Sequence, residues 1–199
     1  MSRPALDVAH LPDIAFGHRS VVWWGTMGII AIEGMMFALV SVAYLYLKGR
    51  NPHWPSGYLP PDLLWGTVNT VVLLASAVPN QLTKTAAERF DFLRARRWLV
   101  VAIAFAVVFN VIRIFEFRSL NVWFDSNGYG SATWALLGFH TVHILTDLID
   151  STVLCGVLYL GPVKESHLVD VSENSLYWYF VVLAWLPIYG LIYWAPRLA

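Results

Sequence analysis

Five long apolar stretches constrain the fold of this chain more than any other feature of its sequence. They occupy residues 21–47, 63–83, 98–117, 132–160 and 176–194 of the 199-residue chain. Each reaches or approaches the roughly 20 residues that cross about 30 Å of hydrocarbon as an α-helix. The residues from Val100 to Phe109 do not alternate between apolar and polar, as the strands of a membrane barrel do. We therefore predict an all-α, polytopic membrane protein built as a bundle of five transmembrane helices.

The composition supports a membrane protein and excludes several other classes. Hydrophobic residues make up 58% of the chain and charged residues only 13%, whereas soluble domains carry about 25% charged residues. This excludes a soluble domain, a disordered chain and a nucleic-acid-binding protein. The single cysteine, Cys155, excludes a disulfide framework and a cysteine-built metal site. The loops are too short for a separate catalytic domain, so we expect residues 1–199 to form one membrane domain.

Lysine and arginine are divided unequally between the two ends of the predicted bundle. Eight of them lie on the side of the N-terminus and four on the opposite side, with Arg113 inside a stretch. Because cytoplasmic loops carry the excess of positive charge, we expect the N-terminal tail, residues 1–20, to be cytoplasmic and the C-terminus to be outside. We interpret the cluster from Arg94 to Arg97 as part of this topology signal. The alternative is a patch for lipid headgroups or a partner.

Ionisable residues inside the apolar stretches are the first candidates for function, because each costs at least about 2.5–3.5 kcal/mol at mid-membrane. They are Glu33, Arg113, Glu116, His140, His143, Asp147 and Asp150. The last four lie on one stretch and fall within an arc of about 80° when it is drawn as a helix. They predict a polar stripe that faces other helices or a water-filled cavity, because lipid offers no polar partner.

Glu33, Asp147 and Arg113 lie at similar predicted depths, about 18, 20 and 22 Å from the cytoplasmic end of their helices. Arginine is always charged, so we expect Arg113 to form an ion pair with Asp147 or Glu33. The remaining acids are then candidates for a proton-exchanging site, with Glu33 as the first choice.

A purely structural role is the alternative for the same polar residues. In this interpretation Glu33, Glu116, Asp147 and Asp150 are protonated in part and join histidines in hydrogen bonds between helices. His140, His143, Asn69 and Thr70 would then belong to one structural network, with Asn69 and Thr70 as donors between helices.

The sequence His-x-x-His followed by two aspartates also permits a metal site. Imidazole and carboxylate together suit zinc, iron or manganese, but the spacing is not diagnostic and the motif His-Glu-x-x-His is absent. We therefore expect no metal in this chain. The alternative is a free-standing membrane protein that binds a metal or moves protons through His140, His143, Asp147 and Asp150.

Short motifs along the chain resemble subunit III of the haem-copper respiratory oxidases, in its shorter five-helix form. Residues 54–55 and 69–76 resemble the Trp-Pro loop of that family and its "NT-x-x-LLAS" helix. Residues 128–131 and 138–143 resemble its "YGS…GFHGLH" sequence, and residues 177–185 resemble "YWHFVDVVW". Order and spacing agree from about residue 20 onward. Glu33 and Glu116 occupy the positions of intramembrane acids of the family.

The chain departs from the family pattern at five positions. Tyr179 and Val182 stand where the family usually has histidine and aspartate, and Asp147 and Asp150 stand where it usually has small or apolar residues. Arg113 is also outside the pattern. These departures leave open a related complex, such as a nitric oxide reductase, in place of a cytochrome c or quinol oxidase.

The resemblance implies a noncatalytic subunit that binds no haem or copper and has no activity alone. It implies partners, the catalytic subunit I and subunit II, with haem and copper held in the partner subunits. It also implies phospholipid bound between the helices, and support of proton uptake during aerobic electron transport. The expected location is a bacterial-type inner membrane, which the chain crosses several times.

Overall fold

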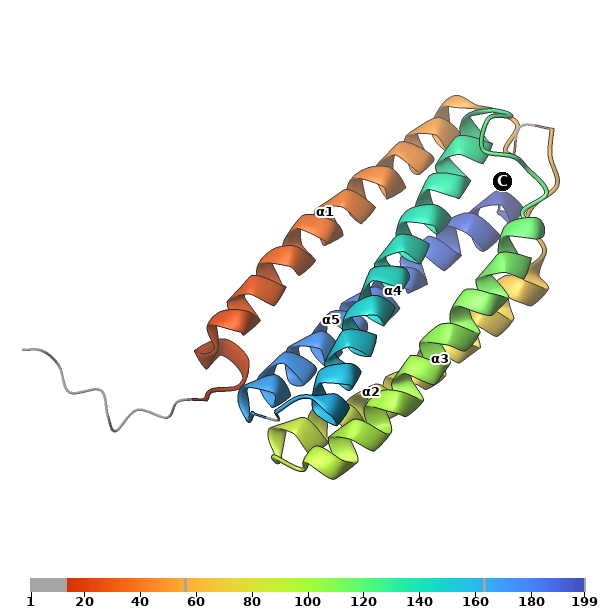
Figure 1. Cartoon of the computed structure of the whole chain (residues 1–199). Coiled ribbons are helices and arrows are strands. Elements are labelled where there is room, and N and C mark those ends of the chain that lie inside the picture. Colours follow the sequence, from red (N-terminus) through yellow and green to blue (C-terminus); the bar gives the residue numbers. More distant parts are fainter. Residues whose placement is uncertain (1–13, 56, 163, 199) are drawn as a thin grey trace, which may run out of the picture.

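The computed structural model describes residues 14–55, 57–162 and 164–198, and these form a bundle of long helices (Figure 1). The helices are α1 (Val21–Arg50), α2 (Leu63–Glu88), α3 (Phe92–Arg118), α4 (Gly128–Leu160) and α5 (Ser166–Tyr189). All five are long and apolar enough to cross a membrane. The predicted all-α architecture of five membrane-spanning helices is therefore confirmed. Residues 1–13 of the predicted cytoplasmic tail lie outside the described residues.

The helices extend beyond the apolar stretches from which they were predicted. The third begins at Phe92 rather than at 98, and the fifth at Ser166 rather than at 176. The Asp91 side chain caps the third helix by accepting a hydrogen bond from the Arg94 amide at 3.0 Å. Hydropathy marks only the part of a helix in hydrocarbon, whereas the helix continues through the headgroup region to its cap.

Helices α2 to α5 pack against one another, and α1 lies along α4 and α5 (Figure 1). Phe37 and Tyr44 are the buried side chains of α1. At the far end of α1, Trp54 donates a hydrogen bond from Nε1 to Tyr44 Oη at 3.1 Å and packs edge-on against Tyr129 of α4. This aromatic cluster holds the end of α1 against α4, whereas the first half of α1 is left more open.

After α5 the chain continues as a π-helical turn, Gly190–Trp194, and a short 3-10 helix, Ala195–Arg197. This turn places the fully buried Tyr193 against α2. The approach is possible because residue 66 is glycine: a Cβ atom there would overlap the ring of Tyr193.

We expect Gly66→Ala to lower the free energy of unfolding by about 1–3 kcal/mol, the usual cost of overpacking. The added methyl would push the Tyr193 ring out of place, which denaturant titration in detergent micelles would detect. Gly156→Ala is the matched control, because a Cβ at Gly156 meets nothing within 4 Å. Equal stability of the two variants would show that the close approach at Gly66 is not required.

Candidate functional site

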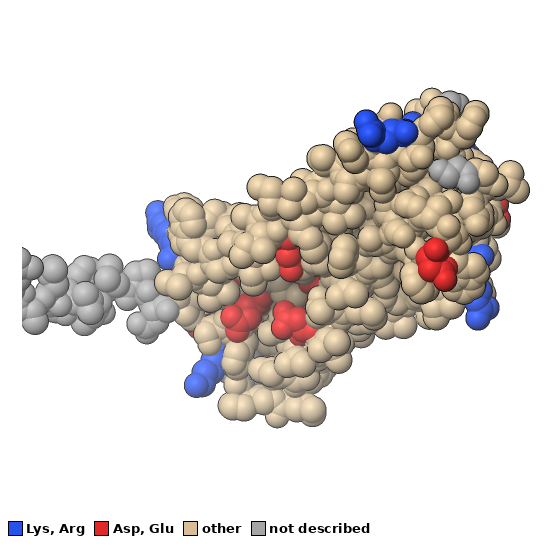
Figure 2. Space-filling view, turned by 90° about the horizontal axis from the view of Figure 1, so that it is seen from above, with Lys and Arg blue, Asp and Glu red and all other residues tan. Residues whose placement is uncertain are grey.

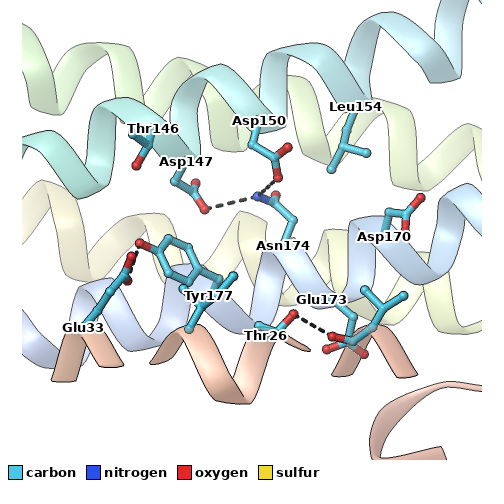
Figure 3. A pocket seen from close by; sticks show the side chains of 12 residues that line it. Thr26, Glu33, Thr146, Asp147, Asp150, Leu154, Asp170, Glu173, Asn174 and Tyr177 are labelled. Carbon is cyan, nitrogen blue, oxygen red and sulfur yellow. Dashed lines mark hydrogen bonds between the residues drawn. The ribbon is translucent and has the colours of Figure 1, made fainter. Parts of the chain in front are cut away.

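An acidic cavity of about 510 Å³ opens between α1, α4 and α5, in the half of the bundle where α1 begins. Figure 2 shows carboxylates gathered around this hollow, and Figure 3 shows the lining side chains. The acidic members of the lining are Glu33, Asp147, Asp150, Asp170 and Glu173. Among the residues that the structure describes, no lysine or arginine lines it. The cavity therefore gathers five carboxyl groups without a basic side chain in its described wall.

The spacing of residues on two helices builds this wall. On α4, Asp147 and Asp150 are three residues apart, and on α5 Asp170, Glu173, Asn174 and Tyr177 follow at offsets of 0, 3, 4 and 7. Residues at these offsets share one face of a helix. The two polar faces meet across the cavity, and α1 closes it from the third side (Figure 3).

Glu33 reaches the cavity from α1, and its side chain is 23% exposed. Tyr177 donates a hydrogen bond from Oη to Glu33 Oε2 at 2.7 Å, and His143 Nε2 lies 3.5 Å from Oε1 (Figure 3 shows the tyrosine contact). His143 Nδ1 lies 2.6 Å from the Phe139 carbonyl oxygen, which can only accept, so Nδ1 carries a proton. The Nε2 atom is thus the one that faces Glu33, and the two groups are placed to share a proton.

Asp147 and Asp150 are joined by one amide. Asn174 Nδ2 donates to Asp147 Oδ1 at 3.1 Å and to Asp150 Oδ2 at 3.3 Å (Figure 3). Ser151 in turn donates to Asn174 Oδ1 at 2.9 Å and fixes the orientation of the amide. Asp147 is 4% exposed and Asp150 faces the opening. Glu33 and Asp147, placed at similar depths by the sequence, thus line the same cavity without a direct bond.

Two acids of the cavity, Asp170 and Glu173, lie outside the five predicted stretches and are not among the predicted site residues. Glu173 is 3% exposed, and neither of its carboxylate oxygens has a hydrogen-bond partner among the described residues. The missed signal is the helical repeat of Leu168, Val171 and Ser175 before the apolar stretch, all of which are buried.

A second polar cluster is fully buried and separate from the cavity. Arg113 lies 2.9 Å from Glu116, measured from Nη1 to Oε2, with side-chain exposures of 1% and 0%. The contact is an ion pair by distance, but its alignment is not that of a hydrogen bond. The guanidinium also lies 4.5 Å from the ring centroid of Phe109 and 4.3 Å from that of Trp185. Such stacking on aromatic faces stabilises a desolvated cation.

The expected pairing of Arg113 with Asp147 or Glu33 was therefore wrong. The depth estimate compared separate helices, whereas Glu116 follows Arg113 by three residues on the same helix and is already within reach.

Side chains from two other helices donate hydrogen bonds to Glu116. Asn69 of α2 donates from Nδ2 to Glu116 Oε2 at 2.8 Å, and Tyr193 donates from Oη to Oε1 at 2.7 Å. Nearby, Trp185 Nε1 donates to Thr70 Oγ1 at 2.7 Å, while the Thr70 hydroxyl donates to its own helix. Asn69 thus donates between helices as expected, but Thr70 accepts the bond between helices.

His140 connects the ion pair to α5. Its Nε2 atom lies 3.0 Å from the Val181 carbonyl oxygen and its Nδ1 atom lies 3.2 Å from Arg113 Nη2. A carbonyl only accepts and a guanidinium only donates, so these contacts assign the proton to Nε2 and the lone pair to Nδ1. His140 is a neutral bridge between α3 and α5.

The structure does not bring the four residues of the metal alternative into one ligand set. His140 faces Arg113, His143 faces Glu33, and the two aspartates face Asn174. Within residues 14–55, 57–162 and 164–198, no group of three or more His, Cys, Asp or Glu side chains has the geometry to hold a metal ion. The predicted stripe is instead divided. His140 belongs to the buried cluster around Arg113, His143 contacts Glu33, and the two aspartates line the cavity.

Comparison with known proteins relates the whole bundle to one family. The family model described as cytochrome c oxidase subunit III matches residues 59–196. The cytochrome c oxidase subunit 3 of Thermostichus vulcanus is 24% identical over 189 residues, covering 93% of this chain and 92% of the relative. That of Corynebacterium diphtheriae is 27% identical over 185 residues, covering 90% of each.

A further relative carries the matching region as part of a larger protein. The heme-copper oxidase subunit I+III of Aeropyrum pernix is 26% identical over 197 residues, which cover 94% of this chain and 24% of that protein. Together with the match over residues 59–196, these similarities and the helical bundle establish the family. The chain belongs to the cytochrome c oxidase subunit III family of the haem-copper respiratory oxidases.

Proposed function

We propose that this chain is a noncatalytic subunit of a bacterial respiratory oxidase that stabilises the catalytic subunit and supports proton uptake by it. The family membership and the Aeropyrum pernix relative, whose name joins subunits I and III, support a place beside subunit I. Subunit II is the second proposed partner. Haem and copper belong to the partner subunits in this proposal, and the chain acts without a cofactor of its own.

The acidic cavity is the observation that carries the proton-uptake role. Its five carboxylates share a hollow of about 510 Å³ with no basic side chain in the described lining. A cleft lined by one sign of charge raises the local concentration of counter-ions, and here the mobile counter-ion is the proton. Glu33 is the innermost acceptor along α1, because it lies beyond Thr26 from the start of the helix and its Oε1 atom lies 3.5 Å from His143 Nε2.

Phospholipid bound against α1 is the other part of the proposal. This helix buries little of its surface, with exposed apolar side chains such as Ile32, Met35 and Leu39. Lipid chains ordered along this face would cover the apolar wall and keep the cavity open only toward the membrane surface.

Deleting this chain tests the stabilising role. We expect the remaining oxidase to assemble in lower yield and to lose activity faster during turnover, measured as the half-life of oxygen consumption under continuous assay. Complementation with the wild-type chain is the control. Unchanged yield, turnover rate and half-life after deletion would refute the proposal.

The double substitution Asp147→Asn/Glu33→Gln tests the cavity. We expect it to slow proton uptake by the reconstituted oxidase by severalfold while the complex still assembles, because both side chains keep their size and can still hydrogen bond. Glu165→Gln is the matched control, since Glu165 is exposed in the loop before α5 and outside the cavity lining. Equal proton-uptake rates in all three proteins would exclude the cavity from this role.

A further inference from the structure

We propose that a groove at the turn between α2 and α3 binds the headgroup of an anionic phospholipid. The groove has a volume of about 260 Å³, and its described lining comes from this helical hairpin alone. Arg89 and Arg94 lie in its lining together with Leu82 and Trp98. The turn between α2 and α3 lies at the end of the bundle where α1 begins (Figure 1). The acidic cavity is lined by other helices, α1, α4 and α5.

The charge of the groove is suited to a phosphate group. Arg89 and Arg94 are both exposed, and Asp91 is the one acid among the described lining residues. Asp91 is already engaged, since its Oδ2 atom lies 3.2 Å from Arg94 Nε and its Oδ1 atom caps α3. The Arg89 side chain has no hydrogen bond or ion pair within the described part of the chain. Arginine presents several N–H donors in a planar fork, which matches phosphate oxygens.

The apolar wall of the groove points to a lipid rather than a soluble phosphate. Trp98 lies one helical turn beyond Arg94, and Leu82 lies on the facing helix and is 37% exposed. The apolar surface continues into the membrane-spanning part, where Val78 is 63% exposed. Tryptophan is typical of the headgroup level of a membrane, so the arginines reach the phosphate while the chains follow the apolar surface.

Two of the basic residues at the opposite end of the bundle, Lys48 and Arg197, are engaged with backbone carbonyls. Lys48 Nζ donates to the Ala195 carbonyl oxygen at 2.6 Å, and Arg197 Nη2 donates to the Pro61 carbonyl oxygen at 2.7 Å. They tie the end of the chain to its neighbours, whereas Arg89 and Arg94 present their charge in an open groove. The hairpin arginines thus have a binding role in addition to orienting the protein.

Lipid retention by the intact oxidase complex tests the proposal. We would reconstitute it in nanodiscs of phosphatidylcholine with a minor fraction of phosphatidylglycerol, extract it, and count retained phosphatidylglycerol by native mass spectrometry. Arg89→Gln/Arg94→Gln should weaken retention by roughly twenty-five-fold, since each basic residue near a membrane surface contributes about fivefold. Arg19→Gln/Arg50→Gln, two exposed arginines outside the lining of the groove, is the matched control and should retain lipid as the wild type does.

Two results would overturn the proposal. Equal retention by the hairpin variant and the control would remove the groove as the site. Displacement of phosphatidylglycerol by millimolar inorganic phosphate would identify a free anion as the occupant. Thermal stability in pure phosphatidylcholine should be equal for the three proteins, so a folding defect would be recognised separately from a loss of lipid.

Discussion

Arg113→Leu is expected to lower the free energy of unfolding by about 3–5 kcal/mol, the cost of breaking a buried ion pair on one side. The substitution leaves Glu116, whose side chain is 0% exposed, without its cation. It also leaves His140 Nδ1 without a donor and removes the stacking on Phe109 and Trp185. Denaturant titration in detergent micelles measures the loss, and the yield of folded protein in membranes should fall with it.

A second substitution should restore much of this stability. In Arg113→Met/Glu116→Gln neither charge remains, and the glutamine oxygen can still accept from Tyr193. The Asn69 Oδ1 atom has no hydrogen-bond partner among the described residues. If the Asn69 side-chain amide rotates by half a turn, this oxygen accepts a hydrogen bond from the glutamine amide. Replacing both members of a buried pair by neutral groups is often close to neutral. We expect recovery of at least half of the loss.

Arg118→Leu is the matched control on the same helix. Arg118 is exposed at the end of α3, and surface substitutions usually change stability by about 0.5 kcal/mol or less. If Arg113→Leu is as stable as this control, or if the double variant is less stable than Arg113→Leu, the pairing of Arg113 with Glu116 does not hold the bundle together.

Glu33 is expected to be the carboxyl group that a hydrophobic carbodiimide modifies in membranes. The reagent requires a protonated carboxyl that it can reach from an apolar phase. Glu33 is partly exposed at 23% and is placed to hold a proton shared with His143 Nε2. Asp147 is less accessible at 4% exposure and is held by Asn174. Mass spectrometry of the digested protein locates the modified residue.

Glu33→Gln should abolish nearly all modification, whereas Asp147→Asn should leave it unchanged. Tyr177→Phe is a further informative variant, since it removes the hydrogen bond to Glu33 Oε2 and keeps the ring. It should increase the rate of modification, because the tyrosine hydroxyl no longer occupies one oxygen of the Glu33 carboxyl group. Rapid modification of Asp147 in the wild-type protein would contradict the assignment of Glu33 as the proton-exchanging acid.

The number of helices was predictable because the apolar stretches are long and widely separated. The ends of the helices were not predictable, and for this reason two acids of the cavity were not recognised from the sequence. Asp170 and Glu173 belong to α5, but they precede the apolar stretch of residues 176–194 and are not among the predicted site residues. Membrane helices continue past the hydrocarbon, and the residues beyond it are amphipathic rather than apolar. That part of α5 supplies Asp170, Glu173 and Asn174 to the cavity wall.

The contacts of the ionisable residues were only partly predictable. The sequence places His140, His143, Asp147 and Asp150 on one stripe, but a stripe of about 80° contacts more than one neighbour. Small differences in angle direct His140 toward Arg113 and His143 toward Glu33. Which helix faces which part of the stripe depends on the packing of α1 against α4 and α5, and the sequence pattern does not contain that information.

Affinity purification of the tagged chain from native membranes in mild detergent tests the central conclusion most directly. The account predicts that a haem-bearing, copper-bearing oxidase subunit copurifies at about one copy per tagged chain, and that the preparation reduces oxygen. Mass spectrometry identifies the subunits and absorption spectra count the haem. A tagged chain that purifies without any haem-bearing subunit, from membranes whose oxidase remains active and intact, would contradict it.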